Sequence, residues 1–145
     1  NAFEPYGNEP VIPTLVRTLP FALAGLFVFT RRLRQDDHGI LAFFSITVVL
    51  FFLWAHGWSP QWIVTLTPLI LLNFPTRDGV LVCLVLNLIC FVEYPVFFMR
   101  TGDTGGSISG ALAVPYALTI LLRTALLIGV AIGLYRRATV RAPHG

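Results

Sequence analysis

The sequence predicts an all-α, polytopic membrane protein with about five transmembrane helices, of which the third is short or broken. The chain has 145 residues; 56% of them are hydrophobic and only 12% are charged. Its mean hydropathy is +0.78. This composition leaves too little polar sequence to cover the surface of a water-soluble domain. The apolar stretches must be helical, because an isolated strand in hydrocarbon would leave its backbone groups unpaired.

Five apolar stretches follow one another without a repeat period. They cover about residues 11–30, 39–55, 60–74, 79–99 and 108–135. We interpret residues 11–135 as a single transmembrane helical domain, preceded by an extracytoplasmic tail, 1–10, and followed by a cytoplasmic basic tail, 136–145. The sequence begins with asparagine, and no positively charged, cleavable signal segment precedes its first apolar stretch, so we expect a processed product or part of a longer chain.

The first stretch contains one charge, Arg17, and ends at the basic loop Arg31-Arg32-Leu33-Arg34. The second stretch carries no formal charge and is flanked by His38 and His56. The third is shorter than the roughly 20 residues that a span needs, and Pro68 interrupts it. We therefore expect either a tilted or broken span held among its neighbours or a re-entrant element.

The third stretch opens with a strong helix-start signal. Ser59 can cap a helix, and Pro60 suits the first helical position because it has no N–H to leave unpaired. A helix start carries free backbone donors and the positive end of a dipole, which suit a lipid phosphate. Trp54, Trp58 and Trp62 cluster here, as tryptophans do at membrane boundaries. We expect His56 and residues 59–62 to face a lipid phosphate or a substrate.

The fourth and fifth stretches carry the polar groups of the membrane interior. Cys83, Asn87, Cys90 and Tyr94 recur at helical spacing beside Glu93, and Arg123 lies in the middle of the fifth stretch. Charges inside a membrane are costly and usually paired, so we expect contact between Glu93 and Arg123. Two interpretations follow. Either the pair locks two helices together, or Arg123 or Arg17 binds a lipid phosphate from within the bilayer.

The arginines predict the topology. The chain has no lysine, and five crossings place seven loop or tail arginines on one side, against Arg100 on the other. The positive-inside rule makes the arginine-rich side cytoplasmic, with the N-terminus outside and the C-terminus inside, in a membrane of the prokaryotic cytoplasmic type. The sequence pI of 9.3 then reflects membrane orientation, and no nucleic-acid partner is expected.

No cofactor and no metal site are predicted. Tetrapyrrole ligation by His38 or His56 is an alternative, but bis-histidine haem needs a facing histidine, and the only other one is His144 in the tail. Cys83 and Cys90 are separated by about 10 Å of helix, beyond the reach of a disulfide, so we expect reduced packing residues.

The stretch from Ser59 to Pro68 (SPQWIVTLTP) resembles a motif of glycosyltransferases of the GT-C class that use polyprenyl-phosphate sugars, particularly the mannosyltransferase branch. That motif is Ser-Pro-Gln-aromatic, followed by apolar residues and a proline. The resemblance covers about residues 40–99, with Asn87, Glu93 and Pro95 in its later part. It implies that Ser59, Pro60 and Gln61 line the lipid-phosphate or sugar region on the extracytoplasmic face, with Trp62 in place of the commoner tyrosine.

The sequence also departs from this family. Thr65 replaces a frequent tryptophan, and the acidic first loop that supplies the family's catalytic aspartate has no counterpart, because Glu4 and Glu9 lie in the tail. The chain thus resembles the C-terminal part of such an enzyme, is not expected to be catalytic alone, and has no catalytic residue that we can assign.

Two functions therefore compete. The chain is either a membrane module of a glycosyltransferase that uses a polyprenyl-phosphate sugar, or a non-catalytic accessory subunit of a larger membrane complex, such as a respiratory or photosynthetic one. The expected partners are membrane lipids, polyprenyl phosphate in the first case, and other membrane protein chains.

The topology is testable by cysteine labelling from outside the cell. Because the arginine-rich loops are retained inside, we expect labelling of cysteines engineered at positions 8 and 104 and none at positions 35 and 140. Labelling of position 140 from outside would show that the C-terminus is not cytoplasmic.

Overall fold

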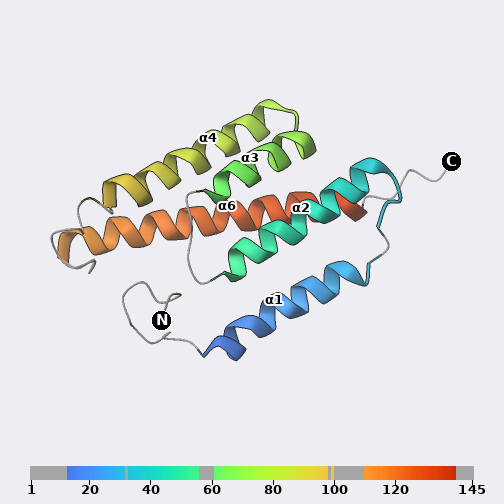
Figure 1. Cartoon of the computed structure of the whole chain (residues 1–145), viewed down its shortest axis with the longest axis horizontal. Coiled ribbons are helices and arrows are strands. Elements are labelled where there is room, and N and C mark those ends of the chain that lie inside the picture. The colour runs from blue at the N-terminus through green and yellow to red at the C-terminus, as the bar shows by residue number, and fades with distance from the viewer. Residues whose placement is uncertain (1–12, 32, 56–60, 98, 100–109, 140–145) are drawn as a thin grey trace. The chain divides into compact units, whose positions relative to one another are not determined.

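The computed structural model describes residues 13–31, 33–55, 61–97, 99 and 110–139 (Figure 1). All regular structure in these ranges is helical, so the predicted all-α class is confirmed. In chain order the elements are α1 (Thr14–Phe29), α2 (Asp37–Trp54), α3 (Trp62–Asn73), α4 (Arg77–Phe91), the π-helix η1 (Val92–Phe97), the 3₁₀-helix η3 (Gly110–Leu112) and α6 (Ala113–Thr139). The expected count of about five helices agrees with these elements.

Three helical runs are long and apolar enough to cross a membrane: Asp37–Trp54, Arg77–Phe97 and Gly110–Thr139. The runs Leu15–Phe29 and Trp62–Asn73 are apolar but shorter. The 12 residues of α3 rise only about 18 Å, against a hydrocarbon core of about 30 Å. The chain therefore has the helices of an integral membrane protein, and its third helix is short, as the sequence predicts.

Side-chain caps fix where two of the helices begin. The Asp36 carboxylate accepts a hydrogen bond from the Gly39 backbone N–H at 3.0 Å, and the Thr76 hydroxyl accepts one from Gly79 N–H at 3.4 Å. Arg34 Nε also donates to Asp36 at 3.1 Å. The bond from Arg34, more than any other contact, holds the pKa of Asp36 below its ordinary value. Both helix starts are therefore set by polar groups outside the apolar spans.

Two helix boundaries differ from the sequence expectation. The third helix begins at Trp62, after Gln61, whose side chain makes no capping hydrogen bond. The expected cap, Ser59, and the expected first residue, Pro60, lie outside the described residues. The last helix continues through Arg136 and Arg137 to Thr139, four residues into the segment expected to be a tail. Arginines suit this position because the C-terminal turn of a helix presents free carbonyls.

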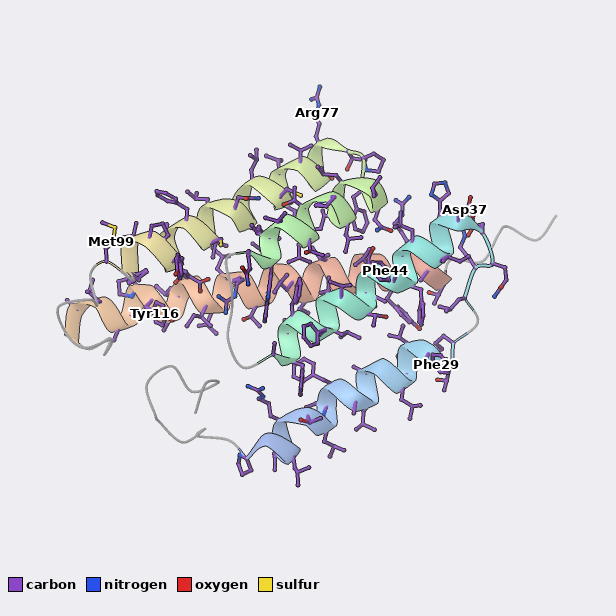
Figure 2. All side chains as sticks on the ribbon, viewed as in Figure 1. Phe29, Asp37, Phe44, Arg77, Met99 and Tyr116 are labelled. Atoms are coloured by element: carbon purple, nitrogen blue, oxygen red, sulfur yellow. The ribbon has the colours of Figure 1, made fainter. Side chains whose placement is uncertain are left out.

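The chain packs as two compact units. The first unit contains α1, α2 and the last turns of α6 from Val130. In it α1 and α2 are antiparallel, and Phe29 and Asp37 mark the end at which they are connected (Figure 2). At the other end the indole Nε1 of Trp54 donates to the Thr18 hydroxyl at 3.0 Å. The backbone N–H of Arg34 donates to the Ala138 carbonyl at 2.9 Å, which ties the connection to α6.

The second unit contains α3, α4, η1 and α6 through Gly129. Its core includes Leu66 and Ile70 of α3 and Leu86 of α4, each almost completely buried. The turn between α3 and α4 requires glycine at position 79, because a Cβ there would overlap the Phe74 carbonyl oxygen. Phe97 packs edge-on against Tyr116 of α6, with ring centroids 5.2 Å apart. This unit holds the polar groups that the sequence places in the membrane interior.

Candidate functional site

The site is built where α4 changes its helical pitch. After Phe91 the chain continues as the π-helix η1, which contains Glu93 and Pro95. Proline has no N–H for the usual bond to the carbonyl four residues earlier, and its ring would collide with that carbonyl. A widened turn relieves the collision, and such π-turns occur frequently at functional positions. The turn sets the direction in which Glu93 leaves the helix, two residues before the proline.

Glu93 forms an ion pair with Arg123 of α6. Arg123 Nη1 donates to Glu93 Oε2, and the two side chains are only 16% and 7% exposed for Arg123 and Glu93, respectively. The contact expected between these charges is therefore present. Removing one partner of a buried pair leaves an uncompensated charge, which lowers the free energy of unfolding by about 3–5 kcal/mol. The pair therefore holds η1 against α6.

One oxygen of the pair has no hydrogen-bond donor. Glu93 Oε1 is buried and accepts no bond from any of the residues that the structure describes. A carboxylate has about four acceptor positions on its two oxygens, so this oxygen has capacity for up to two donors. The pair as a whole is electrically neutral, which limits the cost of burying it in hydrocarbon.

A second polar contact joins α3 to α4. The Asn87 amide donates to the Cys83 carbonyl at 2.8 Å and to the Thr67 hydroxyl at 3.4 Å. The Cys83 thiol donates to the Thr67 carbonyl at 3.8 Å. Of the predicted polar stripe, Cys83 and Cys90 are buried and not joined in a disulfide, whereas Tyr94 is 51% exposed. The stripe therefore serves helix packing at its cysteines and does not form one continuous polar surface.

The other predicted site residues do not join Glu93 and Arg123. Arg17 is half-buried in the first unit, near the start of α1, and His38 is exposed in the first turn of α2. Gln61 is exposed at the start of α3, followed by half-buried Trp62. His56, Ser59 and Pro60 lie outside the described residues. Among the described residues, no group of three histidine, cysteine or acidic side chains is placed to hold a metal ion.

Sequence reasoning missed two features. The π-turn was not predicted, although proline two residues after an intramembrane glutamate is a signal for a local break in the helix. The hydrogen bond from Trp54 to Thr18 was also not predicted, because the partners are 36 residues apart and neither is unusual alone.

Comparisons with known proteins add no relative: no family model, no curated protein and no solved structure matches the chain.

The Glu93–Arg123 pair predicts a characteristic pattern of stability. We expect Glu93→Leu or Arg123→Leu alone to destabilise the protein by about 3–5 kcal/mol, because each leaves a buried charge without its partner. The double variant should regain most of that loss, since two leucines of comparable volume carry no charge. The free energy of unfolding of the wild type, the two single variants and the double variant is measured in mixed detergent micelles by far-ultraviolet circular dichroism. Additive losses in the double variant would show that the two charges are not coupled.

Proposed function

We propose that the chain is a helical membrane module that works by assembling with other membrane chains, as an accessory or structural subunit. The observation that carries this proposal is the Glu93–Arg123 ion pair. Ionised groups inside membrane proteins serve either transport and catalysis or the fixing of helices relative to one another. Here the two opposite charges form an ion pair with each other. That arrangement favours a structural role for Glu93 and Arg123, the residues that are energetically most costly to place inside a membrane.

The surface of the second unit supports assembly. Leu81, Leu84, Leu88 and Phe91 are all more than half exposed and recur on one face of α4 at helical spacing. On α6, Leu118, Leu121 and Leu122 are likewise exposed. Membrane helices associate by close packing of such faces, without a hydrophobic driving force relative to lipid. Each exposed face is therefore covered either by fluid lipid or by a partner helix.

Bulky substitution distinguishes a partner helix from lipid, because lipid chains adapt to an added ring and a packed helix does not. We expect the tagged chain, extracted from its native membrane in digitonin, to migrate on native gels as a larger complex. Tryptophan in place of Leu19, Leu88 or Leu121 tests the exposed faces of α1, α4 and α6. Overpacking costs about 1–3 kcal/mol, so at least one variant should lose roughly tenfold or more of the complex while another retains it.

The migration of the tagged chain on native gels decides whether the assembly proposal holds. A chain that migrates by itself from native membranes, or three variants that all keep the wild-type complex, would contradict an assembly role.

A second candidate is the glycosyltransferase module, and one observation favours it. Gln61, from the Ser-Pro-Gln-aromatic motif, is exposed at the start of α3 and is not used as a cap, so its amide is available to a ligand. In this reading Gln61 contacts a polyprenyl-phosphate sugar beside the free N–H groups of the helix start.

A pair of glutamine variants tests this second candidate. If Gln61 binds the sugar donor, Gln61→Ala in the complete native assembly should reduce sugar transfer about tenfold or more and leave the amount of assembly unchanged, because one hydrogen bond to a charged group contributes roughly 1.5–3 kcal/mol. The chain's other glutamine, the exposed Gln35, provides the matched control and should have no effect as alanine. Equal transfer by both variants would remove the reason for assigning Gln61 to a substrate.

A further inference from the structure

We propose that the groove between α1 and α2 in the first unit binds one acyl chain of an anionic phospholipid, with Arg17 selecting its headgroup. The groove has a volume of about 400 Å³ and is lined almost entirely by apolar side chains. It is independent of the Glu93–Arg123 pair and of the assembly role proposed above. The argument rests on the size of the groove, its ends and its charge.

The size of the groove fits a single hydrocarbon chain. It extends along α1 from Thr18 to Phe29, and at 1.5 Å per residue that is about 16 Å. This length is close to the depth of one leaflet of the hydrocarbon core, about 15 Å.

The groove is too narrow to enclose a helix. A volume of 400 Å³ over that length leaves about 25 Å². A hydrocarbon chain, whose carbon atoms contact neighbours at about 4 Å, needs about 16 Å². A helix about 10 Å in diameter would need about 80 Å².

The interior of the groove is shaped by a glycine. A Cβ added at Gly25 of α1 would meet no atom within 4 Å, so the space over this residue is empty of protein. Thr47 faces the groove from α2, with its hydroxyl already bonded to the Phe43 carbonyl of its own helix at 2.9 Å. Neither residue therefore presents a free polar group to a hydrocarbon chain. An unfilled groove would forfeit dispersion contacts along its walls, which lipid can restore.

The two ends of the groove differ in character. Near the connection between the helices, the rings of Phe29 and Phe43 approach with centroids 6.5 Å apart. At the other end the Trp54 indole donates a hydrogen bond to the Thr18 hydroxyl, and tryptophan is typical of the headgroup boundary. Arg17 directly precedes Thr18 and lies one turn before Phe21, so it shares the groove-lining face of α1.

The charge at this end determines which lipid is preferred. Packing of an acyl chain in the groove is the same for neutral and anionic lipids, so the chain alone gives no selectivity. A nearby arginine favours an anionic headgroup by an amount that corresponds to about a fivefold preference. Arg31, just beyond the opposite end of α1, stacks on Phe27, with its guanidinium carbon 4.1 Å from the ring centroid. Arg31 therefore provides a matched arginine control away from the Arg17 end of the groove.

Photocrosslinking in nanodiscs tests the proposal. The two probes are phosphatidylglycerol and phosphatidylcholine that carry the same diazirine-labelled acyl chain, each diluted into phosphatidylcholine discs containing the full chain. Crosslinked residues are identified by mass spectrometry. We expect the phosphatidylglycerol probe to label the walls of the groove about five times more strongly than the phosphatidylcholine probe.

Two sets of variants distinguish binding of the acyl chain from recognition of the headgroup. Gly25→Phe, or Thr47→Phe from the other wall, should fill the groove and reduce its labelling by both probes about fivefold or more. Gly129→Phe is the control, because its Cβ also meets nothing within 4 Å and Gly129 does not line the groove. Arg17→Gln should bring the ratio of the two probes close to one without abolishing labelling, whereas Arg31→Gln should preserve the ratio.

Several results would overturn the proposal. If groove labelling were unchanged in both Gly25→Phe and Thr47→Phe, no acyl chain would lie in the groove. If the wild-type protein were labelled equally by the phosphatidylglycerol and phosphatidylcholine probes, there would be no headgroup preference. In native membranes, a photoreactive residue at position 47 that crosslinks to protein would identify a partner chain as the occupant. Circular dichroism and size-exclusion elution are measured for every variant to confirm that its helices are retained. Because Gly25 lies on α1 and Thr47 on α2, the two wall variants test the same groove independently.

Discussion

The structure depends on one constraint: polar and charged groups inside hydrocarbon need partners supplied by the protein. Glu93 and Arg123 meet this need for each other across η1 and α6. Their positions cannot be changed independently, because moving either one leaves a desolvated charge, and no rearrangement of lipid chains can compensate it. The pair therefore fixes the register of η1 against α6, which apolar contacts alone, tolerant of sliding, would not do. In this sense a costly pair supplies specificity more than stability.

Several other polar side chains satisfy the same constraint within their own helix. The hydroxyls of Ser45, Thr47, Thr124 and Thr139 and the amide of Asn73 each donate to the carbonyl four residues earlier in their own helix. Such bonds need no other helix, so these residues place few demands on the fold. Prolines have the opposite effect, because they remove a donor. Pro95 accordingly coincides with a change of pitch, and Pro68 lies in the shortest of the membrane-type helices, where neighbouring helices are needed to accommodate it.

Much of this fold could be predicted from the sequence, and the reason is physical. Hydropathy and the exclusion of open strands from hydrocarbon predict the helices, and the rarity of ionisable residues in spans makes Glu93 and Arg123 natural partners. The exact helix ends were harder to predict from the sequence. The last helix ends at Thr139 and not at the expected Tyr135, because a turn that contains Arg136 and Arg137 continues the helix. The groove could not be predicted, since it depends on the distance between α1 and α2, which periodicity does not specify. The π-turn depends on how one collision at Pro95 is relieved, and several local geometries would relieve it.

Depth explains why two arginines of one chain are assigned different partners. Arg123 lies ten residues into α6, about 15 Å along the helix from its start, which is farther than its side chain can reach to a headgroup. Its counter-charge must come from protein, and Glu93 provides it. Arg17 lies in the first turn of α1, on the same side as a boundary tryptophan, so its guanidinium can extend to headgroup depth along an apolar surface. A cation at that depth is stabilised by water and by anionic lipid. The same residue type therefore fixes helices at one depth and selects lipid at another.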